Sequence, residues 1–221
     1  MAVFTSAGFA LEHPVAGVIG VDDDTAVLAA AIAGRLGLRG NPTPAALAAR
    51  DKYQQRELLA AAGVPVPRYA LHPSDVDPET LSRAIAYPCV LKPLRLSASR
   101  GVIRADTPAD FVAAFRRLGA ILAQPDVAAC GEPARRLLVE QFIPGPEVAL
   151  EGLLIGGRLQ LLALFDKPDP LDGPFFEETI YVAPSRERAE VQQQIAAAVA
   201  SAAAALGLHH GPLHAECRVN D

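Results

Sequence analysis

One lysine and the loop that follows it have the clearest chemistry in the sequence. Residues 87–91 form an apolar run that ends at Lys92, as expected of a buried strand that carries one ammonium to the edge of a sheet. The loop after this run contains small residues and a further cation: Ser97, Ser99, Arg100 and Gly101. Small residues leave backbone N–H groups free to close over phosphate oxygens, which the two cations would neutralise. The pattern predicts a nucleotide triphosphate site, although a strand-end lysine alone is more often a solvated surface charge.

Further motifs stand before and after this loop in a fixed order. They are Asp51-Lys52 at the start of a helix, residues 138–143, Pro144-Gly145-Pro146-Glu147, residues 173–181 and His214-Ala215-Glu216. In this order the motifs resemble the ATP-grasp superfamily. Residues 173–181 are most similar to its ATP-dependent carboxylate–amine ligases of the L-amino acid ligase type, which join amino acids or similar small molecules.

The resemblance implies an α+β chain with the ATP-grasp fold, in which two α/β subdomains clasp ATP. We expect a partial N-terminal α/β domain over residues 1–42, a linker helix with the small subdomain over 43–140, and the large subdomain over 141–221. The residue pattern itself predicts strands at 15–21, 89–92, 102–104, 137–142, 148–154, 158–165 and 212–219. It predicts helices at 26–36, 43–62 with a bend, 78–86, 108–118 and 185–206. It also predicts a turn and helix cap at residues 22–25 and the two-residue turn of an antiparallel hairpin at Gly156-Gly157.

The resemblance assigns the phosphates of ATP to Lys52 and Lys92, which match the family's two phosphate-binding lysines. Without the resemblance, Lys52 would be interpreted as a solvated helix charge. Ser97, Ser99 and Gly101 would then close over the same phosphates.

The resemblance places the nucleoside at the end of a strand. The backbone of Gln141, Phe142 and Ile143 would contact adenine, and the Glu140 side chain would face its exocyclic amine. Glu147, just after a Pro-Gly-Pro turn, matches the carboxylate that accepts the ribose hydroxyls. The simpler alternatives are an edge-strand charge for Glu140 and a turn carboxylate for Glu147.

Transfer of a phosphoryl group from ATP requires divalent cations, and Mg²⁺ prefers carboxylate ligands. Glu216 lies where the family's first metal carboxylate is found. His214 is two positions earlier on the same predicted strand and therefore shares its face. For His214, a core histidine and a site residue are equally good interpretations.

Glu178 and Arg100 are the residues that we assign to catalysis. In the resembling ligases a glutamate before a threonine faces the substrate amino group, and Glu178 matches it, although Glu177 is an alternative. Lys167 and Asp172 lie on the adjoining predicted loop, which could order over the substrate, but we expect both to face solvent.

The composition excludes several other classes of protein. The chain has 221 residues, 51% of them hydrophobic and 20% charged, as in a globular protein, and its net charge of -5 offers no footprint for nucleic acid. No apolar run reaches the ~20 residues that a membrane span needs. The three cysteines lack metal-binding spacing, which indicates free thiols and a cytoplasmic location.

The expected reaction is the ATP-dependent formation of an amide through an acyl phosphate, with small carboxylates and amines, above all amino acids, as partners. Alternatives are an ATP-binding module without catalysis and an ATP-grasp carboxylase, the latter disfavoured by residues 173–181. Relatives carry a fuller N-terminal domain and a second metal carboxylate on a strand after Glu216, so we expect a shortened chain with little activity of its own. The resemblance leaves open a homodimer.

Overall fold

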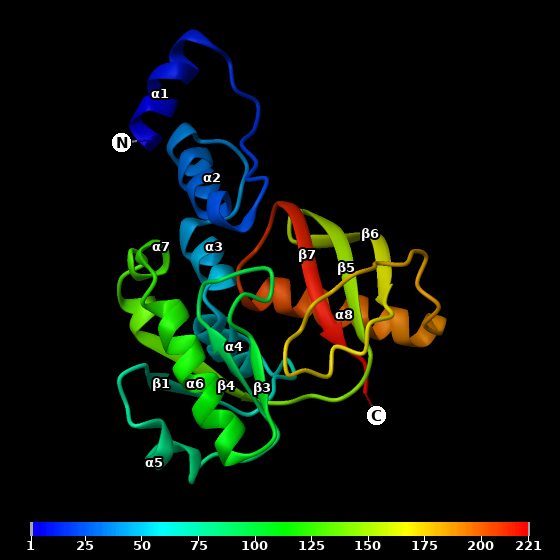
Figure 1. Cartoon of the computed structure of the whole chain (residues 1–221). Coiled ribbons are helices and arrows are strands. Elements are labelled where there is room, and N and C mark those ends of the chain that lie inside the picture. The colour runs from blue at the N-terminus through cyan, green and yellow to red at the C-terminus, as the bar shows by residue number, and fades with distance from the viewer. Residues whose placement is uncertain (1, 221) are drawn as a thin grey trace.

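The computed structural model describes residues 2–220, which form two antiparallel sheets with helices packed against them (Figure 1). The first sheet has the order β1 (Tyr69–Pro73), β4 (Arg136–Gln141), β2 (Cys89–Pro93), β3 (Ile103–Ala105). The second has the order β6 (Arg158–Lys167), β5 (Glu147–Ile155), β7 (Gly211–Arg218). The helices are α1 (Ala2–Glu12), α2 (Asp23–Leu36), α3 (Thr43–Arg50), α4 (Lys52–Ala61), α5 (Pro78–Ser82), α6 (Pro108–Leu122), α7 (Pro125–Ala128), a 3-10 helix η1 (Glu132–Arg135) and α8 (Ala189–Ala205). This arrangement confirms the predicted α+β class.

The N-terminal region differs most from the sequence prediction. The strand predicted at residues 15–21 is wrong, because this segment is an irregular connection between α1 and α2. Val21 is 91% exposed, and an apolar run forms a strand only where another backbone pairs with it. Helix α2 is as predicted: Asp22 and Thr25 form a reciprocal cap at its start, and Gly37 ends it in the left-handed conformation.

The bend predicted within residues 43–62 is a complete break at Asp51. The Asp51 carboxylate accepts hydrogen bonds from the backbone N–H groups of Tyr53 and Gln54, so it caps a new helix. Arg95 forms an ion pair with the same buried carboxylate at 3.2 Å. The break makes Lys52 the first residue of α4 and directs it toward the segment that follows β2, where the Lys52 N–H donates to the Leu94 carbonyl.

In the first sheet, β4 lies between β1 and β2, and α6 covers one face. Leu91, Leu137 and Phe111 are fully buried between the sheet and this helix. Strand β1 has no alternating apolar pattern, and its existence depends on pairing along the whole of β4, so the sequence prediction missed it. Strands β2 and β4 are as predicted and carry Lys92 and Glu140.

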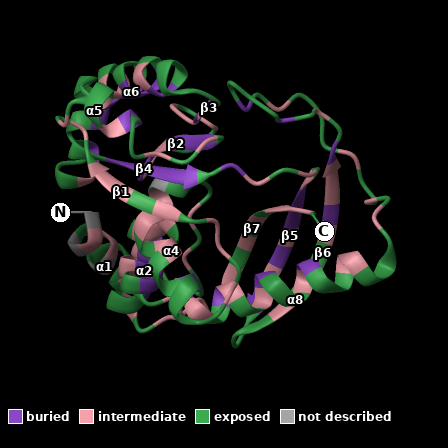
Figure 2. Cartoon of the chain, turned by 90° about the horizontal axis from the view of Figure 1, so that it is seen from below, coloured by how far each residue is buried: buried purple, intermediate pink, exposed green. Residues whose placement is uncertain are grey.

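The second sheet is built on the predicted hairpin of β5 and β6. Gly156 and Gly157 have φ values of 59° and 79° at its turn, a conformation that favours glycine at both positions. Helix α8 packs below this sheet, and Ile195 and Val199 contact the buried Val148 (Figure 2). Strand β6 continues to Lys167, two residues beyond its predicted end.

The chain crosses between the sheets at residues 142–146 (Figure 1). Within residues 2–220, no helix is both long and apolar enough to cross a lipid bilayer.

Candidate active site

The first candidate site lies on one side of the first sheet, where α4 faces β2 and β4. The Glu140 carboxylate is 2% exposed and divides its oxygens between two cations. Lys92 Nζ lies 2.6 Å from Oε2, and Arg56 Nε lies 2.6 Å from Oε1. Lys52 is one helical turn before Arg56, and its Nζ donates to the Leu96 carbonyl at 2.6 Å. We call Lys52, Arg56, Lys92 and Glu140 the cationic cluster.

The charges in the cationic cluster affect one another. Burial alone would raise the pKa of Glu140, but Lys92 and Arg56 outweigh it and hold the pKa below its ordinary value. Burial, and after it the positive charge of Lys92, lower the pKa of Lys52 to about 8. A group of cations that repel one another in a partly buried place favours the arrival of an anion. This property fits the predicted phosphate role of Lys52 and Lys92.

The loop at residues 97–101 has an unusual backbone. Ala98, Ser99 and Gly101 all have positive φ. Gly101 has a φ of 81°, a conformation that favours glycine, and a Cβ there would also be crowded, at 3.0 Å from Leu118 Cδ1. The Arg100 guanidinium contacts α7 through Asp126, at 2.9 Å, and through Gln124. The catalytic role of Arg100 and the phosphate roles of Ser97, Ser99 and Gly101 stay predictions.

The predicted adenine segment follows Glu140 directly. The backbone N–H groups of Gln141 and Phe142 donate to the carbonyls of Arg68 and Pro88. The buried ring of Phe142 lies under the guanidinium of Arg104, 4.0 Å from the ring centroid. Any contact of Gln141, Phe142 or Ile143 with adenine therefore depends on their remaining backbone groups, and this assignment stays a prediction. The Glu140 side chain faces cations in this structure, where adenine was expected.

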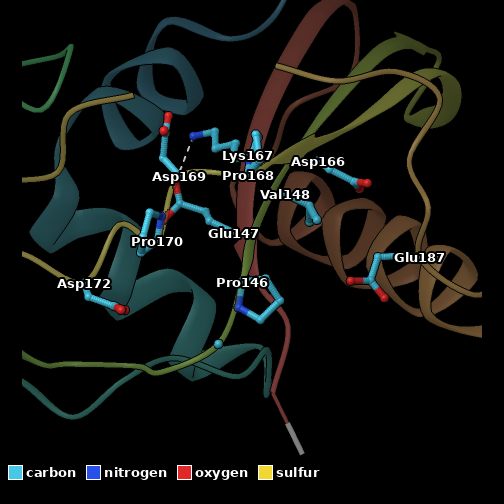
Figure 3. Close-up of a pocket in the computed structure, with 11 residues that line it drawn as sticks. Pro146, Glu147, Val148, Asp166, Lys167, Pro168, Asp169, Pro170, Asp172 and Glu187 are labelled. Atoms are coloured by element: carbon cyan, nitrogen blue, oxygen red, sulfur yellow. Dashed lines mark hydrogen bonds and ion pairs between the residues drawn. The ribbon is translucent and has the colours of Figure 1, made fainter. Parts of the chain in front are cut away.

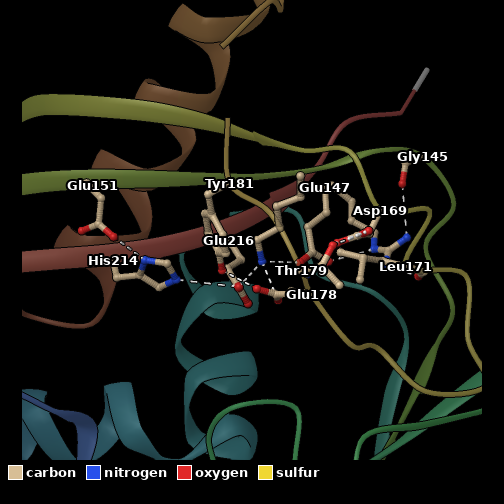
Figure 4. A network of polar contacts seen from close by, with 12 residues as sticks. Gly145, Glu147, Glu151, Asp169, Leu171, Glu178, Thr179, Tyr181, His214 and Glu216 are labelled. Atoms are coloured by element: carbon tan, nitrogen blue, oxygen red, sulfur yellow. Dashed lines mark hydrogen bonds and ion pairs between the residues drawn. The ribbon is translucent and has the colours of Figure 1, made fainter. Parts of the chain in front are cut away.

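The second candidate site lies at the end of the second sheet, where Glu147, Glu178 and Glu216 come together (Figure 4) around the ammonium of Lys167. Lys167 Nζ lies 2.8 Å from Glu147 Oε1 and 2.7 Å from Glu178 Oε1, and it also contacts Glu216 Oε1. One oxygen of each carboxylate lies within 4.8 Å of the others. We call Lys167 and these three glutamates the acidic cluster.

Lys167 corrects the sequence prediction. We expected it to face solvent from a loop, but it ends β6 and its side chain is completely buried. It lies directly opposite Glu147 in the pairing of β5 with β6, while Glu216 lies opposite Ala149 in the pairing of β5 with β7. The alternation of side chains along β6 could have revealed this position. If the predicted strand is extended by two residues, Lys167 lies on the same face as Phe165.

Of Glu177 and Glu178, it is Glu178 that turns inward, while its role toward a substrate amine stays a prediction. Glu177 is exposed, whereas Glu178 contacts Lys167 and accepts a hydrogen bond from the Tyr181 hydroxyl. The next residue, Thr179, donates its backbone N–H to Asp169 at 2.6 Å and so fixes the segment.

His214 lies beside the acidic cluster. Its Nδ1 is 2.7 Å from Glu151 Oε1, and its Nε2 is 3.7 Å from Glu216 Oε1 (Figure 4). Glu216 first and Glu151 next raise the pKa of His214 to about 9, against the effect of burial. The imidazole in turn, together with Lys167, lowers the pKa of Glu216 to about 2. The His214 side chain is 48% exposed, so the core-histidine alternative is wrong, and its role in the site stays a prediction.

The irregular segment that follows β6 joins the two clusters. Residues 168–182 cross from β6 to the first sheet, where the Arg104 N–H donates to the Pro174 carbonyl. Leu171 and Phe176 are buried against Phe142 and Val90, which precedes Lys92 by two residues on β2. The same segment thus places Glu178 in the acidic cluster and packs on the strand that carries Lys92.

A pocket of about 530 Å³ opens beside Glu147 and Lys167 (Figure 3). Its wall includes carboxylates of the end of β6, of the loop after it and of the segment before α8: Asp166, Asp169, Asp172 and Glu187. Asp172 is exposed, as expected from the sequence.

Comparisons with known proteins show the family of the chain. A family model described as the ATP-grasp domain matches residues 85–221. The chain is 29% identical over 170 residues to the D-alanine–D-alanine ligase of Aromatoleum aromaticum, with 76% of this chain and 51% of that protein covered. It is 27% identical over 197 residues to the alanine–anticapsin ligase of Bacillus subtilis strain 168, with 84% and 41% covered.

Among solved structures, the L-amino acid ligase from Bacillus licheniformis is similar to the whole fold. The TM-score is 0.85 at 31% identity, and the match covers 99% of this chain and 51% of that one. The chain spans about half the length of these relatives or less. Since the family model matches more than half of the sequence and the fold agrees, the chain belongs to the ATP-grasp family.

Proposed function

We propose that the chain binds Mg·ATP between its two clusters and serves a ligase that joins a carboxylate to an amine. The observation that carries this proposal is the pair of clusters of opposite charge, joined by residues 168–182. Lys52 and Lys92 offer ammonium groups to phosphate oxygens, and Glu216 offers a carboxylate to a divalent cation. The similarity to ligases that act on alanine and other amino acids supports amino acids as substrates.

The acidic cluster fits a divalent metal by the chemistry of its donors. Glu147, Glu178 and Glu216 come from separate segments and bring hard oxygen atoms within 4.8 Å of one another. Bound Mg²⁺ would supply charge neutralisation for the phosphates. Lys167 already neutralises these carboxylates. Its side chain is long enough for the ammonium to turn toward a phosphate once a metal ion also binds the carboxylates. Glu147 Oε1 would then be available to the ribose hydroxyls, while Oε2 stays paired with Arg218 at 3.3 Å.

The reaction that we propose has two steps. A substrate carboxylate oxygen attacks the γ-phosphorus of ATP, which forms an acyl phosphate and releases ADP. A neutral amine then attacks the acyl carbon, which forms the amide and releases phosphate and a proton. Lys52 and Lys92 would hold the phosphates in place and stabilise the charge that develops on them.

Glu178 is the proposed partner of the substrate amine. In this structure it already accepts a hydrogen bond from an alkylammonium group, that of Lys167, and from the Tyr181 hydroxyl. A substrate ammonium has the same donor chemistry, so the geometry of Glu178 suits it.

The test is calorimetric titration of the chain with ATP and Mg²⁺, followed by measurement of ADP release with pairs of amino acids. Glu216→Gln is the matched variant, since glutamine keeps the size of the side chain but loses the charge. We expect the wild-type chain to bind ATP and, because little activity is expected of the chain by itself, to release ADP only slowly and only with amino acids, a release that Glu216→Gln abolishes. ATP binding without release would indicate the non-catalytic module, and release that depends on bicarbonate would indicate the carboxylase. A folded chain without ATP binding would overturn the proposal.

A further inference from the structure

The sequence pattern assigned no role to Arg56, but hydrogen bonds hold its side chain in the cationic cluster. Only 17% of it is exposed, and Gln55 Oε1 accepts from its Nη1 at 2.8 Å. Its Nε and Nη2 reach the Glu140 oxygens Oε1 and Oε2 at 2.6 and 3.4 Å. The two residues are 84 positions apart in the chain, so the pair forms only in the folded protein.

The Glu140 carboxylate pairs with both Arg56 and Lys92, and this shared pairing affects how easily Lys92 can move. If Lys92 turns to a phosphate, it withdraws its charge from a carboxylate that is almost completely buried. A buried carboxylate without a cation is strongly unfavourable, so a Glu140 paired with Lys92 alone would hold that lysine back. Arg56 removes this obstacle, because it stays on Glu140 while Lys92 moves.

We propose that Arg56 is a positioning residue that neutralises Glu140 and so leaves Lys92 free for an anionic ligand. The inference rests on the proposed binding of ATP. Arginine suits the role better than lysine, because its planar fork meets both carboxylate oxygens and keeps its charge at every physiological pH. Lys52, one turn earlier, donates to the Leu96 carbonyl and does not replace it.

The experiment compares ATP affinities of wild type, Arg56→Met, Glu140→Gln and the double variant by calorimetry with Mg²⁺. We expect Arg56→Met to weaken ATP binding about tenfold or more, since Lys92 then remains on Glu140. Adding Glu140→Gln should restore the affinity to within about threefold of wild type, because glutamine has no charge to hold Lys92. A merely structural role of Arg56 would not be rescued in this way.

Adenosine is the matched ligand, because it lacks phosphates, and its affinity should be the same in wild type and Arg56→Met. Arg116→Met is the matched variant, since Arg116 pairs with Glu79 on the surface, and it should bind ATP as wild type does. Arg56→Lys, which keeps a cation, provides a second variant if Arg56→Met fails to fold, and its loss should be smaller and also rescued by Glu140→Gln.

An ATP affinity of folded Arg56→Met equal to wild type, a failed rescue, or an equal loss for adenosine would each overturn the role of Arg56 while the proposed function stands. A folded wild-type chain that binds no ATP would overturn the proposed function itself, and the role of Arg56 with it.

Discussion

The two clusters contain the same kinds of ion in opposite proportions. In the described residues, Lys52, Arg56 and Lys92 gather around Glu140, whereas Glu147, Glu178 and Glu216 gather around Lys167. In each cluster the ion in the minority is the buried one: Glu140 is 2% exposed and the Lys167 side chain 0%. The ions in the majority lie nearer the surface, with Glu216 at 44%. A single buried ion can therefore hold several opposite charges in place. The cations around Glu140 are then available to an anionic ligand, and the glutamates around Lys167 to a cationic one.

The first test removes the buried ion at the centre of a cluster. Lys167→Met should lower the free energy of unfolding by ~3–5 kcal/mol, since it removes the cation that the three glutamates share and leaves, among the described residues, only Arg218 beside Glu147 and His214 beside Glu216. Chemical denaturation measures the loss. Mg²⁺ should restore part of it, and more than it adds to wild type. As a control, Arg136→Met removes an exposed pair with Glu132 and should cost under ~0.5 kcal/mol. Equal losses in the two variants would contradict the prediction.

The second test removes a majority ion from the cationic cluster. Lys92→Ala should weaken ATP binding by ~1.5–3 kcal/mol, or roughly ten- to a hundredfold, because it deletes a charged contact to phosphate. Stability should change less than in Lys167→Met, since Arg56 still neutralises Glu140. Calorimetry gives the affinity. If Lys92→Ala binds ATP as tightly as wild type, the phosphates lie elsewhere.

A smaller effect should appear in the pH dependence of the acidic cluster. The pKa of His214 is raised to about 9 in the folded chain, so protonation favours folding. Its stabilising contribution is complete below the ordinary value of 6.5 and disappears as the pH rises through about 9. Wild type should therefore melt at a higher temperature than His214→Gln at pH 6, and the two should converge near pH 10. A difference that persists unchanged at pH 10 would contradict this assignment.

The smallest effect concerns protons taken up on binding. The pKa of Lys52 is lowered to about 8, so at pH 9 much of the free folded chain has a neutral amine there. Phosphate nearby favours the ammonium, and ATP binding at pH 9 should take up a fraction of a proton. Calorimetry in two buffers of different ionisation enthalpy measures it, and Lys52→Gln should lack the uptake. Identical heats in both buffers for wild type would sink the prediction.

Local patterns in the sequence were enough for part of this arrangement. The strands that carry Lys92 and Glu216, the glycine hairpin and the capped start of α2 depend on neighbouring residues, and they were predicted. Arg56 and Lys167 were not assigned a role, because their function depends on partners that only the fold brings near. Strand β1 and the irregular segment at residues 15–21 were missed for a related reason, since strand formation depends on a second backbone.

The two strands that pair with β5 should join it at different times during folding. Strand β6 reaches it through a two-residue turn, and hairpins of this kind form in ~1–10 μs. Strand β7 pairs with the other edge of β5, and a long loop and α8 separate the two strands in the sequence. Contacts of such large sequence separation form more slowly. Glu147 and Lys167 therefore meet early, while Glu216 and His214 join them late. During folding the chain should acquire its affinity for nucleotide in the last kinetic phase, well after its hairpin has formed.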